Sequence, residues 1–362
     1  MLSFFKSEYI LFLAITTAMF FIFFGDLLLG DLNNIPLVAL AFGIIFLVML
    51  MSSFSVVRHA DELAVKLGEP YGTLILTLSV ITIEVVAISA VMLTGADNPT
   101  LGRDMMFSVI MITLNGLVGL SLLVGGMKHM QQEYNLQGVN SFIALIFPLA
   151  VLGLILPNFT LSSAYGTFST FQTYFLIFVT VTLYLIFLFM QTLRHKNFFV
   201  LDHEVEEKHQ ESEHSLTYHI SMLIAYLVPI VLLSKKLAIV VNHSISEVGA
   251  PAALGGLLVA ILVLSPEGMS AIKAALNNKL QRAINISMGS ALATISLTIP
   301  AVLLIGLATG EKVVLGLNGV DTVVLLLTLF MSILNFSSGK SNIIQGLIHI
   351  MLFVLYLLLI FD

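Results

Sequence analysis

The stretch LLVAILVLSPEGMSAIKAALNNKLQRAINISMGSALATISLTIP, residues 257–300, decides the fold of this chain. It is apolar enough to cross a lipid bilayer, yet it carries one carboxylate, Glu267, directly after Pro266. A second isolated carboxylate, Glu84, lies in the apolar run LTLSVITIEVVAISA, residues 76–90. A charge at bilayer depth costs roughly 2.5–3.5 kcal/mol on insertion scales, so such residues usually serve a function. We therefore expect two mid-membrane carboxylates that bind a cation or protons.

The composition is that of a polytopic membrane protein. Of the 362 residues, 58% are hydrophobic and only 10% are charged, whereas a soluble domain carries about 25% charged residues. The net charge of −6 is small and lies in loops, so nucleic acid is not an expected partner. The absence of cysteine excludes thiol catalysis and thiolate metal sites. The expected partners are the lipid bilayer and small inorganic cations, and the sequence does not specify an oligomeric state.

Eleven apolar windows are long enough, or nearly so, to cross a bilayer as helices. They are 8–25, 35–57, 70–95, 104–126, 140–157, 169–192, 216–234, 250–272, 282–309, 319–335 and 341–361. The first window lacks a small-residue cleavage site, so we interpret it as a retained helix and not as a signal peptide. Because backbone groups in lipid must be satisfied within each segment, the expected fold class is all-α.

The distribution of Lys and Arg between alternate loops predicts the orientation. One side receives most of these residues, whereas the other receives only Arg103, Lys235, Lys236 and Lys312. The positive-inside rule then places the N-terminus in the cytoplasm and the C-terminal Asp362 outside. An odd number of helices requires the same arrangement, so the helix count and the charges agree.

The second to sixth windows can be laid over the seventh to eleventh. Glu84 then matches Glu267 with an offset of 183, and Arg103 matches Arg282 with an offset of 179. Because five helices is an odd number, the second half must enter the membrane inverted, which is typical of secondary transporters whose site lies at the midplane. The predicted units are an N-terminal peripheral helix and loop (1–34), a first five-helix repeat (35–192), an acidic cytoplasmic linker (193–215) and a second, inverted repeat (216–362).

Pro266 predicts a local break in the helix that carries Glu267. Proline lacks an N–H and its ring clashes with the carbonyl four residues back, so we expect the break near Leu262. A broken helix at mid-membrane frees carbonyl oxygens beside the carboxylate, which suits an ion site. The alternative is a packing kink, with the glutamate hydrogen-bonded to a neighbouring helix.

Small polar residues form a stripe on the ninth window. Ser287, Ser290, Thr294 and Thr298 follow at spacings of three, four and four, which places them on one helix face. A shift of 179 residues brings Thr294 onto Asn115 in the first half. We select Asn115, Ser290 and Thr294 as candidate cation ligands beside the two glutamates. The alternative is a tight contact between helices, which small residues favour in membranes.

Two charged segments lie outside the windows. The connector from Ser55 to Tyr71 has helical spacing, and we interpret it as a solvated surface segment, with a gating or ion-access role for His59, Glu62 or Glu69 as the alternative. The linker DHEVEEKHQESEH, 202–214, separates the halves as a solvated linker would. Its alternative role is a divalent-metal or pH sensor. The candidate ligands for that regulatory metal are Asp202, His203, Glu206, Glu207, His209 and Glu211.

The motifs KLGEPYG (66–72), LSPEG (264–268), LNNKLQRA (276–283) and GSALATISLT (289–298) resemble those of the ChaA-type bacterial cation/proton antiporters. These belong to the calcium/cation antiporter superfamily and are similar to the vacuolar calcium/proton exchangers. The resemblance covers nearly the whole chain and includes the acidic linker. It implies a peripheral helix followed by two inverted five-helix repeats, with the essential acidic residues at Glu84 and Glu267.

The sequence departs from the vacuolar exchangers at neutral ligand positions. Their Gly-Asn-x-x-Glu motif corresponds here to Val80-Ile81 and to Val263-Leu264, and an amide of their second motif corresponds to Ala293. Because calcium takes six to eight oxygens, some of them neutral, these departures leave room for sodium or potassium.

We expect an antiporter of the bacterial inner membrane that exports Ca²⁺ in exchange for H⁺ by alternating access. The alternative is a Na⁺/H⁺ or K⁺/H⁺ antiporter with little Ca²⁺ transport. The glutamates would hold the transported ion, and no cofactor is expected. Nucleotide loops, HExxH and GxSxG are absent, so the sequence does not indicate an enzyme. Two competing classes are a passive channel, which needs no proton coupling, and a membrane scaffold, in which neither glutamate affects any flux.

Overall fold

The structure is a computed structural model that describes residues 7–25, 29, 34–67, 71–92, 99–201, 214–249, 251 and 253–361. Within these ranges the regular secondary structure is helical, apart from a single β-bridge between Glu133 and Lys340. Seven helical segments are long and apolar enough to cross a membrane, and four shorter apolar helices accompany them. The predicted all-α polytopic fold with eleven helical spans is therefore confirmed.

The peripheral helix and the first repeat occupy the first half of the chain. Their elements are α2 (Tyr9–Phe23), α4 (Ile35–Leu67), α5 (Tyr71–Met92), α6 (Leu101–Met111), η1 (Ile112–Leu117), α7 (Val118–His129), α8 (Leu136–Ala150), η2 (Val151–Ile155), η3 (Leu156–Phe159), α9 (Thr170–Phe189), η4 (Met190–Arg194) and η5 (Lys196–Phe198). The segments α6, η1 and α7 form one continuous span.

The second repeat has the same order of spans. Its elements are α10 (Leu216–Val248), α11 (Ala253–Leu276), α12 (Leu280–Ala293), η7 (Thr294–Thr298), α13 (Ile299–Thr309), α14 (Gly319–Asn335) and α15 (Ile343–Leu359). Here α12, η7 and α13 form one continuous span, the counterpart of α6–η1–α7.

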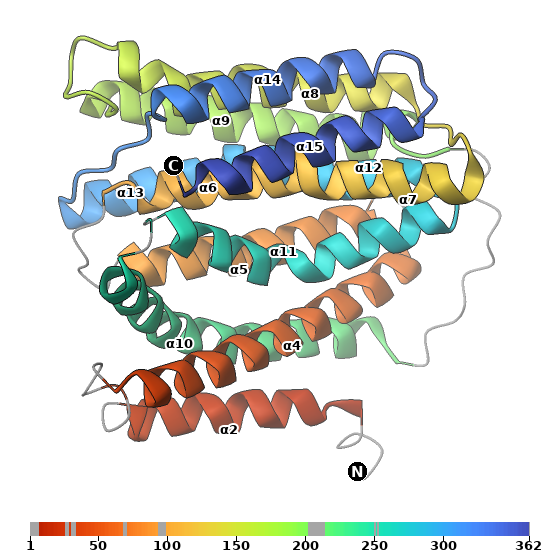
Figure 1. Cartoon of the computed structure of the whole chain (residues 1–362). Helices are drawn as coiled ribbons and strands as arrows, with labels where there is room; N and C mark the ends of the chain where they lie inside the picture. Colours follow the sequence, from red (N-terminus) through yellow and green to blue (C-terminus); the bar gives the residue numbers. More distant parts are fainter. Residues whose placement is uncertain are drawn as a thin grey trace.

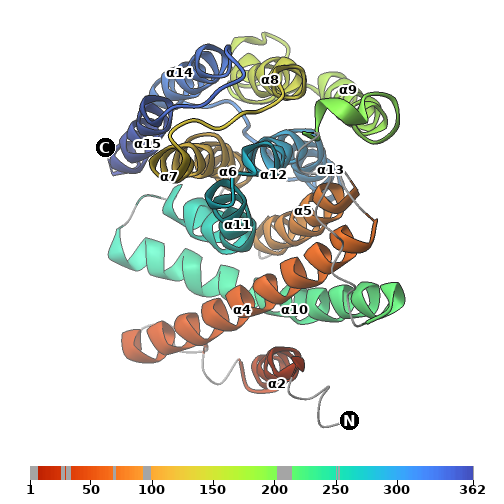
Figure 2. The same ribbon diagram turned by 90° about the vertical axis from the view of Figure 1, so that its right-hand side faces the viewer.

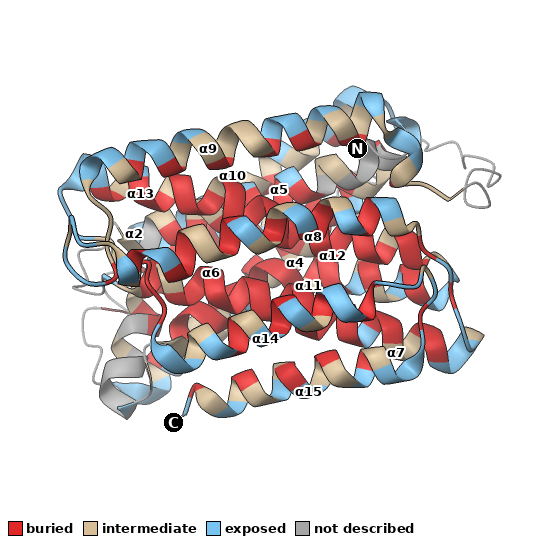
Figure 3. Ribbon diagram, turned by 90° about the horizontal axis from the view of Figure 1, so that it is seen from above, coloured by how far each residue is buried: buried red, intermediate tan, exposed pale blue. Residues whose placement is uncertain are grey.

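The helices stack in layers across the molecule. In Figures 1 and 2, α2 is outermost, the long helices α4 and α10 cross above it, and α5 and α11 follow. The spans α6–η1–α7 and α12–η7–α13 come next, and α8, α9, α14 and α15 cover their far side. Figure 3 shows buried residues gathered on α6, α11 and α12, so the two carboxylate-bearing helices lie next to the best-buried part of the bundle.

Several of the outer helices have a side-chain cap at the N-terminus. Ser169 and Asn342 each form a capping box, with Gln172 and Gln345 respectively. Asn318 accepts from the backbone N–H of Asp321 at the start of α14. Such caps satisfy N–H groups that the first helical turn leaves without a partner.

The predicted break near Leu262 was wrong, because α11 continues through Pro266 as one helix. The hydroxyl of Ser265 donates to the carbonyl of Ile261 in the turn that proline weakens. A membrane helix tolerates proline where neighbouring helices and local adjustments satisfy the freed backbone groups. The irregular segments are instead the π-helices η1 and η7, which occupy matching places in the two repeats.

The surface connector predicted for residues 55–71 was also wrong over its first half. The helix α4 continues to Leu67, and Val56, Val57, His59 and Ala60 are all buried within the bundle. The charges of this segment resemble those of a solvated helix face, but His59 points inward and finds polar partners there. The corresponding helix α10 likewise extends to Val248, well past its predicted end.

Glycines bring two pairs of helices into backbone contact. A Cβ atom on Gly346 of α15 would lie 2.6 Å from the N atom of Leu123 and 2.8 Å from the carbonyl oxygen of Gly119 on α7. A Cβ atom on Gly256 of α11 would lie 2.8 Å from the N atom of Met105 on α6. Only glycine fits at such distances, so these positions fix how closely elements of the two repeats approach.

Candidate functional site

Glu84 and Glu267 are both completely buried, with no exposed surface. Glu84 lies on α5 of the first repeat, and Glu267 lies on α11 of the second. These helices are neighbours in Figures 1 and 2, and the charge of Glu84 acts on Glu267. The structure thus brings together the two carboxylates that the sequence singled out.

Glu84 accepts a hydrogen bond from a residue of the opposite repeat. The hydroxyl of Thr294, the first residue of η7, donates to Oε2 of Glu84 over 2.8 Å. Thr298, one turn further along, also lies beside this carboxylate. Among the described residues, Oε1 of Glu84 has no hydrogen-bond partner. One oxygen of Glu84 is therefore fixed by a donor, and the other is open to a proton or a cation.

Glu267 has a different environment. Ser290 of α12 lies beside it, but neither carboxylate oxygen meets hydrogen-bond geometry with a described residue. Tyr184 of α9 is buried close enough for the charge of Glu267 to act on its phenol. Buried polar atoms normally have partners, so the two open carboxylate oxygens of Glu267 can accept a proton or a cation.

Other buried hydroxyls lie on α5 and on the span α12–η7, the elements that carry Glu84 and its donors. Their side-chain oxygens have no hydrogen-bond partner in the part of the chain that the structure describes: Thr77, Ser287, Ser290, Ser296 and Thr298. Thr77 precedes Glu84 by two helical turns and lies close to Gly289 of α12. Of the hydroxyl stripe predicted on the ninth window, Thr294 and Thr298 lie beside Glu84 and Ser290 lies beside Glu267.

Asn115 lies in the π-helix η1 but does not contact either glutamate in the described hydrogen bonds. Its Nδ2 donates to Thr328 of α14 over 2.8 Å, and its Oδ1 lies 3.0 Å from Nδ1 of His349 on α15. His349 is fully buried and was not selected from the sequence. Because its partner Asn115 lies 234 positions away, no local sequence signal identifies this contact.

The other sequence-selected residues lie apart from the glutamates or outside the described ranges. His59 and Glu62 are on the last turns of α4, where His59 belongs to a separate polar cluster. Glu69 lies outside the described residues. So do the six candidates for a regulatory metal: Asp202, His203, Glu206, Glu207, His209 and Glu211. Within the described ranges, no group of three or more His, Asp or Glu side chains could hold a metal ion.

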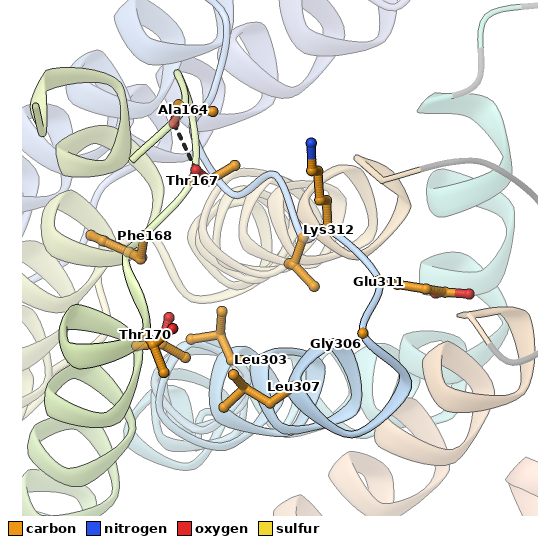
Figure 4. Close-up of a pocket in the computed structure, with 12 residues that line it drawn as sticks. Ala164, Thr167, Phe168, Thr170, Leu303, Gly306, Leu307, Glu311 and Lys312 are labelled. Carbon is orange, nitrogen blue, oxygen red and sulfur yellow. Dashed lines mark hydrogen bonds between the residues drawn. The ribbon is translucent and has the colours of Figure 1, made fainter. Parts of the chain in front are cut away.

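A cavity of about 380 Å³ lies at the end of the bundle near the segment 310–313. It is lined by α9 and α13, including Thr170, Leu303 and Gly306. In Figure 4, Thr170 and Leu303 face each other across the gap, whereas the carboxylate of Glu311 points away. Neither glutamate lines this cavity. However, α13 continues directly from η7, so the lining residue Leu303 lies about two and a half helical turns beyond Thr294.

Comparisons with known proteins found similar sequences and similar folds. A model of the sodium/calcium exchanger protein family matches residues 37–193 and 218–361. The sodium-potassium/proton antiporter ChaA of Escherichia coli is 42% identical over 339 residues, which cover 92% of each chain. The structure of native YfkE superimposes with a TM-score of 0.75 at 17% identity, covering 97% of this chain and 99% of that one. The H⁺/Ca²⁺ exchanger CAX superimposes with a TM-score of 0.69 at 16% identity, covering 98% and 88%.

Proposed function

The chain belongs to the sodium/calcium exchanger protein family of membrane transporters, and from this premise we propose that it is a cation/proton antiporter that exchanges Na⁺ or K⁺ for H⁺. One observation carries the proposal: two completely buried carboxylates, one from each repeat, meet beside hydroxyl groups that have no described hydrogen-bond partner. The other buried carboxylates of the described residues, Glu8 and Asp104, are each paired with an arginine, Arg58 and Arg103 respectively.

The mechanism follows from the cost of burying charge. An unpaired carboxylate deep in a protein is strongly disfavoured, so each glutamate holds either a proton or a cation. A cation that leaves must be replaced by protons, and this competition couples the two flows. Because the carboxylates come from opposite repeats, movement of one repeat against the other exposes them alternately to the two sides.

Two considerations favour a monovalent cation. The E. coli relative of 42% identity is a sodium-potassium/proton antiporter by name. In addition, the neutral groups beside the glutamates are hydroxyls, and the amide of Asn115 is already engaged by Thr328 and His349. Calcium binds through six to eight oxygens and commonly includes carbonyl oxygens among them.

Calcium export, the interpretation that the sequence favoured, is the second candidate function. Two carboxylates balance a divalent charge, and the family includes exchangers of calcium. The proposed location is the inner membrane of a bacterium. The N-terminus would be cytoplasmic and the C-terminus outside, because most Lys and Arg residues lie in loops on the N-terminal side.

The test is transport in everted vesicles or proteoliposomes with an imposed proton gradient and no cation gradient. Uphill accumulation of Na⁺ or K⁺ is expected, whereas a passive channel would accumulate neither. Glu84→Gln and Glu267→Gln should reduce accumulation to the level of empty vesicles while the protein still inserts and folds. The matched control is Glu133→Gln, because Glu133 is an exposed partner of Lys340. Retained exchange in either buried variant would overturn the proposal, and accumulation of Ca²⁺ alone would favour the second candidate.

A further inference from the structure

A second cluster of buried ionisable groups lies far from the glutamate pair, at the end of the bundle where α2 begins. Glu8, the residue before α2, is 2% exposed, His59 of α4 is 2% exposed, and His219 of α10 is 3% exposed. The helices α4 and α10 are the first spans of the two repeats and cross beside α2 in Figure 2. The cluster therefore connects the peripheral helix to both halves of the transporter.

The carboxylate of Glu8 receives donors from both long helices. Tyr218 of α10 donates to its Oε1 over 2.9 Å, and Tyr226 of α10 donates to its Oε2 over 2.8 Å. Nη2 of Arg58, on α4, donates to Oε2 over 2.7 Å. Hydrogen bonds and a positive charge of this kind favour the ionised form of a carboxylate. Glu8 thus provides a fixed negative charge beside the histidines.

The two histidines contact each other directly. Nδ1 of His59 lies 3.0 Å from Nδ1 of His219, so one ring must donate and the other must accept. Nε2 of His59 lies 3.2 Å from Nη2 of Arg58, which can only donate. The contact of Nε2 with Arg58 is shorter than its contact with Oε2 of Glu8, which is 3.4 Å, so in the neutral pair we assign Nε2 of His59 as the acceptor and its Nδ1 as the donor to His219.

An added proton disturbs this arrangement at either ring. A proton on Nδ1 of His219 would place two N–H groups face to face across 3.0 Å. A proton on Nε2 of His59 would face the Arg58 guanidinium, although Oε2 of Glu8 lies 3.4 Å away and offsets part of that repulsion. The contact between α4 and α10 at this point is therefore sensitive to protons.

The surrounding charges act in both directions. Glu8 and Glu62 favour a protonated ring, whereas Arg58 and Lys66 oppose it. The groups that face the two histidines are, from the start of α2, Glu8; from α4, Arg58, Glu62 and Lys66; from α10, Tyr218 and Tyr226; and from the segment before α10, His214.

We propose that His59 and His219 form a second proton-binding site, distinct from the transport glutamates, which couples pH on the N-terminal side of the membrane to the contact between α4 and α10. Proton binding separates the two helices at this end and changes the rate of exchange without supplying a transported proton. His219→Asn is the informative variant, because the Asn side chain can keep a hydrogen bond near the Nδ1 position but cannot titrate.

The direct experiment measures the distance between the two helices, and it does not depend on transport. The chain has no native cysteine, so spin labels attach cleanly to Leu67→Cys on α4 and Leu216→Cys on α10, two exposed positions on one groove. Between about pH 8 and about pH 5, the range in which histidine titrates, the separation should increase in the parent and stay constant with His219→Asn. A constant separation in the parent, or the same increase in His219→Asn, would overturn the proposal.

The second arm is the rate of exchange as a function of pH on the N-terminal side, and this arm rests on the proposed function. With His219→Asn, the rate of exchange should no longer change with pH over the acid part of this range. His129→Asn, at the end of α7 outside the cluster, should leave the pH dependence of the rate unchanged. An acid side that remains in His219→Asn contradicts the regulatory role. Failure of the proposed function is distinguishable, because Glu267→Gln would then transport normally, whatever the spin labels report.

Discussion

The two π-helices η1 and η7 occupy matching places in the two repeats, but their polar residues have different hydrogen-bond partners. In η7, Thr294 reaches across the repeat boundary and donates to Glu84. In η1, Asn115 lies at the matching position, but its amide forms hydrogen bonds with Thr328 and His349. The inverted repeat therefore provides symmetric helices without providing symmetric ligands. We infer that Glu84 and Glu267 are not interchangeable, since only Glu84 is held by a described donor.

The largest effect is expected from removing the donor on the η7 side. Thr294→Val keeps the shape of the side chain but deletes the hydrogen bond to Glu84. A hydrogen bond to a charged group contributes about 1.5–3 kcal/mol, so the apparent cation affinity should fall roughly 10- to 100-fold. Cation-dependent transport measures this affinity, and Thr294→Ser should restore most of it.

The control for that variant is Thr180→Val. Thr180 is equally buried, but its hydroxyl donates to backbone carbonyls within α9. An unchanged affinity in Thr294→Val would mean that the contact between η7 and Glu84 is structural only.

A smaller effect, and one of a different kind, is expected on the η1 side. Asn115→Ala leaves Thr328 and His349 without their partner, so the free energy of unfolding should fall by about 1–3 kcal/mol. Cation affinity should change less than about threefold, because the described hydrogen bonds of Asn115 go to Thr328 and His349 and not to a glutamate. Thermal unfolding in detergent and transport of the same preparation measure the two quantities.

A double-mutant cycle with His349→Leu sharpens this prediction. Because the two side chains share one hydrogen bond, the double variant should lose less stability than the sum of the single variants. A loss of transport in Asn115→Ala as complete as that in Glu267→Gln would show instead that the amide serves the ion.

An effect on stability alone is expected from the packing around these segments. The helices α7 and α15 meet through Gly119 and Gly346, whereas α9 and α13 leave the cavity shown in Figure 4. Gly346→Ala should lower the free energy of unfolding by about 1–3 kcal/mol, because the added methyl group overpacks the contact. Gly43→Ala is the matched control, since no atom lies within 4 Å of its added Cβ. Equal stability of the two variants would contradict the close contact.

The spans and the glutamate pair could be predicted from the sequence, because an apolar window and an isolated buried charge are local signals. The irregular helix geometry could not. Pro266 indicated a break in α11, which instead continues as one helix, while the irregular segments η1 and η7 contain no proline. The partners of Asn115 and His59 were also beyond reach, since both depend on residues more than a hundred positions away.

The burial of Glu8 also affects how the chain can be shortened. A transporter built only from the ten helices of the two repeats would lack the acceptor for the hydroxyls of Tyr218 and Tyr226 and the counter-ion for Arg58. The first helix therefore cannot be trimmed as a dispensable extension. An ancestral exchanger without it would have needed other residues to satisfy these groups.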